Sequence, residues 1–89
     1  MAMPQPRNRV DELRHEQEQL VKAEVDIEQG RTRLRNQQDL LSWRQTAGGD
    51  TSQAERLLQL MQHTLVEWER HRGLIEDRIA LLEKELSGG

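Results

Sequence analysis

Residues 54–86, AERLLQLMQHTLVEWERHRGLIEDRIALLEKEL, decide the fold of this chain. From Ala54 onward, alternating steps of four and three residues land on an apolar side chain every time except at Arg72. This spacing is typical of the core seam of a coiled-coil helix. The seam positions are Ala54, Leu58, Met61, Leu65, Trp68, Arg72, Ile75, Ile79, Leu82 and Leu86. They predict one long helix with an apolar face.

The composition favours helices. The chain has 89 residues, of which 34% are apolar and 33% charged, with two Trp and neither Phe nor Tyr. A chain so short and so polar cannot fill a thick globular core. β-Branched residues never cluster, so the sequence gives no indication of strands. We therefore expect an all-α protein.

The first half of the chain carries a partner stripe of aliphatic residues, each seven positions from the next. Its members are Leu13, Leu20, Ile27, Leu34 and Leu41. A seven-residue apolar repeat predicts a second helix of coiled-coil type. We expect this helix over about residues 9–46, with the second helix over about 52–86 and flexible segments at 1–8 and 87–89.

The helix ends have recognisable signals. Asn8 is a candidate N-cap for the first helix. Gly48 or Gly49 can adopt the left-handed conformation that ends a helix, which places the turn at 47–51. Ser52 with Glu55 three residues later predicts a capping box at the start of the second helix.

So short a turn makes the two helices antiparallel neighbours. An alignment in which paired residue numbers sum to 99 brings four aliphatic pairs level. These pairs are Leu41 with Leu58, Leu34 with Leu65, Leu20 with Ile79, and Leu13 with Leu86. The same alignment sets Trp68 opposite Gly30, where the missing side chain leaves room for an indole ring. Polar neighbours are expected beside the first stripe, namely Gln17, Glu24, Arg31 and Gln38.

Arg72 interrupts the apolar seam. The alignment brings Glu24, Asp26 and Glu28 within about one helical turn of it. A polar residue in a coiled-coil seam commonly fixes register and oligomer state, so we expect an ion pair here or a side chain that extends to solvent. A contact with an anion or a partner protein is the alternative. The residues predicted to set the register are Arg72, Asp26, Glu28, Trp68 and Gly30.

The second helix has more apolar surface than one partner helix can cover. The additional residues, together with a tryptophan of the first helix, are predicted to bind a partner: Leu57, Leu60, Leu74, Leu81 and Trp43. We expect two antiparallel coiled-coil hairpins to pair as a homodimer, forming a four-helix bundle. The alternative occupant is a helix of another protein, as in an adaptor, scaffold or small chaperone.

A nucleic-acid-binding hairpin dimer is the competing functional prediction. The chain has one basic cluster, Arg31, Arg33, Arg35 and Arg44, close to Trp43. Such residues could contact phosphates and a base. The net charge of −3 and the acidic residues between these arginines argue against this function.

The sequence predicts no enzyme, metal or cofactor. There is no Cys, and no nucleophile, base and orienting group can be assembled from the remaining residues. His63, Glu67 and His71 are spaced by four, but no further ligand accompanies them. No long apolar run predicts a membrane segment or a secretory leader, so we expect a cytoplasmic protein without a small-molecule substrate.

Overall fold

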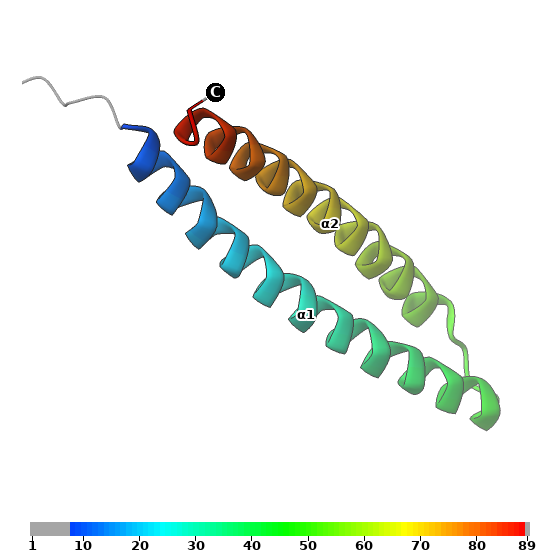
Figure 1. Ribbon diagram of the computed structural model, residues 1–89. Coiled ribbons are helices and arrows are strands. Elements are labelled where there is room, and N and C mark those ends of the chain that lie inside the picture. The colour runs from blue at the N-terminus through cyan, green and yellow to red at the C-terminus, as the bar shows by residue number, and fades with distance from the viewer. Residues whose placement is uncertain (1–7, 89) are drawn as a thin grey trace, which may run out of the picture.

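The computed structural model describes residues 8–88 and contains two helices, α1 (Arg9–Ala47) and α2 (Ser52–Leu86). They lie side by side and run in opposite directions (Figure 1). The described residues form no strand, and the predicted all-α class is confirmed. Of the terminal segments predicted to be flexible, residues 1–7 and Gly89 lie outside the described part of the chain.

The ends of α1 are capped by the residues that the sequence indicated. The Oδ1 atom of Asn8 accepts a hydrogen bond from the Asp11 N–H at 2.8 Å. After Ala47, Gly48 adopts a left-handed conformation with φ of 79°. Its N–H donates to the Gln45 carbonyl at 3.2 Å, which satisfies a carbonyl at the helix end.

The start of α2 differs from the predicted capping box. Ser52 is the first helical residue, and Thr51 occupies the cap position. The Asp50 carboxylate accepts hydrogen bonds from the Ser52 N–H at 3.0 Å and from its hydroxyl at 2.8 Å. These bonds lower the pKa of Asp50. Asp50 thus accepts from the Ser52 N–H, the role that the capping box assigned to Glu55, while the Glu55 carboxylate accepts from the Thr51 hydroxyl at 3.2 Å.

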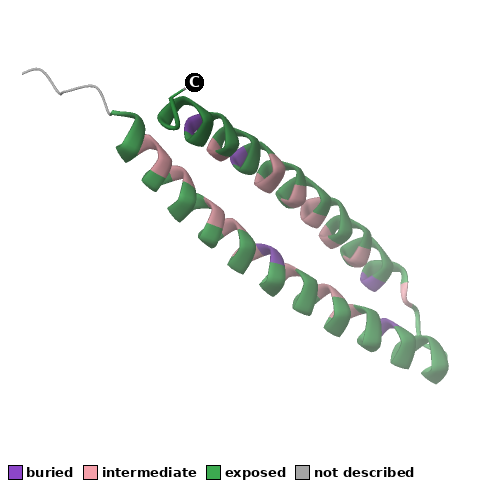
Figure 2. Ribbon diagram, viewed as in Figure 1, coloured by how far each residue is buried: buried purple, intermediate pink, exposed green. Residues whose placement is uncertain are grey.

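The core between the helices is very thin. The buried residues are Ile27, Leu41, Ala54, Ile75 and Leu82. They lie on the facing sides of the helices, whereas most of the remaining surface is exposed (Figure 2). The shortest extent of the molecule is 15 Å, little more than the diameter of one helix. The hairpin is therefore a single layer.

The half-buried positions of α1 show which side of the first stripe faces α2. Between the aliphatic residues of the stripe, the partly buried positions are Glu16, Ala23, Asp26, Gly30 and Gln37, and all of them except Asp26 lie three residues after a member of the stripe. The neighbours predicted from sequence, Gln17, Glu24, Arg31 and Gln38, are all exposed. That prediction was wrong by one position in each heptad. The corrected series advances by alternate steps of three and four, as the seam of α2 does.

This series changes the register of the two helices. Matched in order from the turn, the two series pair Leu41 with Ala54 and Leu13 with Leu82, and these partners include three of the five buried residues. Leu86, the predicted partner of Leu13, is 43% exposed, whereas Leu82 is 2% exposed. At the open end the pairing is therefore displaced by about one helical turn from the alignment on a sum of 99. In the middle of the hairpin, Trp68 still contacts Gly30 and Arg31 pairs with Glu69, sums of 98 and 100.

Ion pairs between the helices agree with the displaced register at the open end of the hairpin. Arg9 Nε lies 2.8 Å from the Glu85 carboxylate. Arg78 lies 3.5 Å from Glu16 and 3.8 Å from Glu12. In each pair the residue numbers sum to between 90 and 94, below the predicted 99.

The predicted contact of Trp68 with Gly30 is present despite the displaced register. A Cβ atom added to Gly30 would lie 3.2 Å from Cζ3 of Trp68 and 3.4 Å from Cδ1 of Leu65. Side chains on a helix lean toward its N-terminus, so the Trp68 ring reaches over the turn that contains Leu65. The ring occupies the space that a larger residue at position 30 would need.

Arg72 does not make the predicted ion pair with an acidic residue of α1. Its Nε lies 3.4 Å from Glu76, one turn further along α2, and its side chain is 30% exposed. Glu24 and Glu28 line the same polar hollow as Arg72, without an ion pair to it. Asp26 lines a different hollow, together with Trp68 and His71. Arg72 thus extends from the seam toward solvent, as the other option in the prediction described.

Two helical glycines provide a test of the packing at Trp68. A Cβ atom at Gly73 would meet nothing within 4 Å. Gly73→Ala should therefore gain the full helix-propensity difference, about 1 kcal/mol in the free energy of unfolding. Gly30→Ala should gain clearly less, or lose stability, because the new methyl group presses on the indole. Urea denaturation followed by circular dichroism measures both; equal gains would contradict the packing described.

Replacing Arg72 tests its place in the seam. Arg72→Leu should retain the helices and raise the free energy of unfolding by about 1 kcal/mol, because an apolar side chain replaces a partly exposed charged one. Glu76→Gln is the control, since it removes the same ion pair and leaves the seam unchanged; it should alter stability little. If Arg72 also fixes the oligomer, Arg72→Leu will broaden the mass distribution in light scattering, and an unchanged single species would argue against that role.

Candidate interaction surface

The four leucines predicted to bind a partner lie on one side of α2 and are all exposed. We call Leu57, Leu60, Leu74 and Leu81 the second stripe; their exposed fractions are 44%, 61%, 55% and 51%. Leu60, Leu74 and Leu81 are separated by multiples of seven residues and therefore stack along the helix. Each residue of the second stripe directly precedes a seam residue in sequence or adjoins one, so the two apolar stripes are neighbours on α2.

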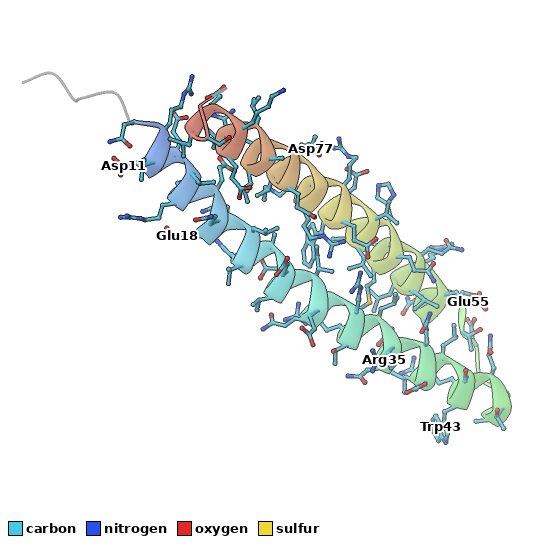
Figure 3. The ribbon with its side chains drawn as sticks, viewed as in Figure 1. Asp11, Glu18, Arg35, Trp43, Glu55 and Asp77 are labelled. Atoms are coloured by element: carbon cyan, nitrogen blue, oxygen red, sulfur yellow. The ribbon has the colours of Figure 1, made fainter. Side chains whose placement is uncertain are left out.

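Trp43 lies at the turn end of α1, away from most of the second stripe. Its side chain points outward from α1 on the side away from α2 (Figure 3). The residue is 65% exposed, and Leu40 one turn earlier is 38% exposed. Leu40 lies three residues before Trp43, which places both apolar residues on one side of α1.

Two hollows between the helices flank the indole of Trp68. The larger, about 200 Å³, is lined by Gly30, Arg33, Leu60, Met61, Thr64 and Trp68. The smaller, about 140 Å³, is lined by Ala23, Asp26, Trp68 and His71. Leu60 belongs to the second stripe, and Thr64 and His71 lie between its leucines in the helical repeat. The hollows therefore place a recessed surface next to the exposed leucines.

The opposite flank of the α2 seam has a different character. The positions that directly follow Ala54, Met61, Trp68, Ile75 and Leu82 are Glu55, Gln62, Glu69, Glu76 and Glu83. The Glu69 carboxylate forms an ion pair with Arg31, whose Nη2 lies 3.0 Å from Oε1. One flank of α2 is consequently acidic, and the other carries leucines.

The basic cluster of α1 is distributed over different sides of the hairpin. Arg31 and Arg35 line a polar hollow with Arg72, and this hollow also contains Glu24 and Glu28. Arg33 lies beside Leu60 and Trp68 instead. Arg31 is already paired with Glu69. The arginines therefore do not form one continuous positive surface.

Most ionisable groups of the described residues are exposed, and eleven of them form ion pairs. The pKa of Arg9 is raised by its hydrogen bond to Glu12 and by the charge of Glu85.

Within residues 8–88, no group of three or more His, Asp or Glu side chains is arranged to hold a metal ion. Neither helix contains an apolar stretch of the length needed to cross a bilayer, in the part of the chain described.

Comparisons with protein-family models, with curated proteins and with solved structures find no match for this chain.

Proposed function

We propose that this chain is a non-catalytic protein–protein interaction module that self-associates through the second stripe. Two hairpins would pair as a homodimer and form a four-helix bundle. The observation that carries this proposal is the exposure of four leucines along one side of α2. In a stable monomer these two pairs of leucines, at either end of the second stripe, would remain in contact with water.

The thinness of the core supports the same proposal. The described hairpin buries five side chains, all aliphatic and one of them an alanine. Small scaffolds with so little core generally need a disulfide, a metal or an oligomer for stability. This chain has no Cys. Pairing through the second stripe would add buried leucines, each contributing roughly 1.5–3 kcal/mol when fully covered.

The role that we assign is that of a scaffold, adaptor or small chaperone. The surface consists of aliphatic side chains at helical spacing, which suits a helix as its partner. A helix of another protein could occupy the same stripe. A second copy of the chain is the simpler partner, because it carries the same apolar stripe.

Substitution within the second stripe tests the proposal. The wild-type chain should have the mass of a dimer by size exclusion with light scattering. Leu74→Glu combined with Leu81→Glu should raise the dissociation constant more than about 100-fold, since each change occurs twice in the dimer and removes an apolar contact.

Val21→Glu combined with Val25→Glu is the matched control, because it adds the same two charges. Both residues are exposed on α1, at 63% and 48%, and lie outside the second stripe, so their replacement should leave the dimer intact. A wild-type monomer across the micromolar range would contradict self-association. Equal weakening by the control and the stripe variant would show that the effect is one of net charge.

A further inference from the structure

The second stripe belongs to a regular heptad series that runs beside the core seam. From Leu57, alternate steps of three and four residues pass through the four leucines and the polar positions between them. The series is Leu57, Leu60, Thr64, Glu67, His71, Leu74, Arg78 and Leu81. It spans about 36 Å at 1.5 Å per residue. Such spacing is what a helix needs to pack against another helix along its length.

The series is complementary to itself in the antiparallel direction. The series alternates the two core positions of a heptad, a and d. When two copies run antiparallel and the numbers of facing residues sum to 138, every a position of one copy faces a d position of the other, as in an antiparallel coiled coil. The resulting pairs are Leu57 with Leu81, Leu60 with Arg78, Thr64 with Leu74, and Glu67 with His71, each formed twice. Leucines meet at both ends, and at the centre Glu67, which is ion-paired with Arg70 of its own helix at 3.1 Å, meets His71.

The parallel direction lacks this complementarity. A parallel two-fold pairing sets every residue against its own copy, which places Glu67 against Glu67 and Arg78 against Arg78. Like charges directly opposed across a helix interface are unfavourable. The acidic flank of α2 is unsuitable for the same reason, because Glu55, Glu76 and Glu83 would face one another there.

Arg78 can take its place in this series without an unpaired charge. Its guanidinium already lies 3.5 Å from Glu16 of α1. The aliphatic part of the side chain is then free to cover Leu60 of the second copy. Leu60 is 61% exposed in the hairpin, so this contact would remove substantial apolar surface from water.

Trp68 gives the pairing an optical reporter. The two-fold axis passes level with residue 69, and Trp68 lines both hollows on the side of the second stripe. Its exposed fraction is 38%, which leaves part of the ring to be covered by the second copy. Trp43, at 65% exposed, lies at the turn end and outside the paired series.

We propose that α2 packs antiparallel against α2 of a second copy of this chain, with Leu57 of each copy against Leu81 of the other and a two-fold axis near Trp68. This inference rests on the proposed self-association and specifies its surface, direction and register.

Disulfide trapping tests the direction. Because the chain has no Cys, Leu57→Cys and Leu81→Cys can be made singly, mixed and oxidised. The mixture should give a covalent dimer on a non-reducing gel, whereas each variant alone should give little, because a disulfide requires Cα atoms within about 7 Å. A mixture of Leu57→Cys and Leu74→Cys is the matched control and should also give little.

The outcomes separate this inference from the proposed function. A dimer in light scattering with strong cross-linking of Leu57→Cys to itself would establish a parallel arrangement and overturn the inference alone. A dimer without cross-linking in the mixture would also overturn it. A monomer under all conditions would overturn both proposals.

A charge exchange supplies a second measurement that needs no disulfide. Glu67→Lys should weaken the dimer roughly tenfold, since it affects two symmetric pairs of modest strength. Glu67→Lys with His71→Glu should restore it by placing opposite charges at the two facing positions. In a Trp43→Phe background, the emission of Trp68 should shift to shorter wavelength on dimerisation. Failure of the double variant to restore the dimer, or an unchanged Trp68 emission, would contradict the pairing.

Discussion

A seam one side chain wide holds this hairpin together. On α2 the seam is apolar at nearly every position, but on α1 each aliphatic residue alternates with a small or polar one. The α1 positions of the second kind are Glu16, Ala23, Gly30 and Gln37. Large residues of α2 therefore meet small or polar ones. The Trp68 ring lies against Gly30, and five side chains are buried among residues 8–88.

The asymmetry of α2 follows from this arrangement. Its acidic flank lies beside Arg31 of α1, and the ion pair with Glu69 joins the helices at this flank. Its other flank carries the leucines. In the self-association that we propose, the second copy would pack on the leucine flank, because two acidic flanks would repel each other.

Much of the fold could be predicted from the sequence because the signals are local. Heptad spacing determines the helices, Asn8 and Gly48 determine the ends of α1, and the small residue at position 30 indicates the contact with Trp68. The register could not be obtained in the same way. Residues seven apart repeat in both helices, so pairing leucine with leucine is satisfied by alignments one turn apart. The two alignments differ in which small or polar residues of α1 face α2, and the sequence alone does not predict that Glu16 or Gln37 will be half-buried.

The partner of Arg72 shows the same limit for charges. Three acidic residues of α1 were expected near it, yet Glu76 on its own helix is the one in contact. A long side chain selects among several exposed carboxylates that differ little in energy, because solvent screens them all. The candidate surface is easier to predict, since an exposed leucine at helical spacing needs no partner geometry to be recognised.

The alternation of steps, rather than the seven-residue repeat, fixes how two such helices can meet. In the hairpin, the core positions of α1 and of α2 are spaced alternately by three and four residues. When the helices run in opposite directions these spacings coincide, and Leu13 then lies level with Leu82. The pairing that we propose for the series beginning at Leu57 would obey the same rule with its own copy. Register and direction would then come from the geometric condition that acts in the hairpin, while Glu67 facing Glu67 and Arg78 facing Arg78 would disfavour the parallel solution.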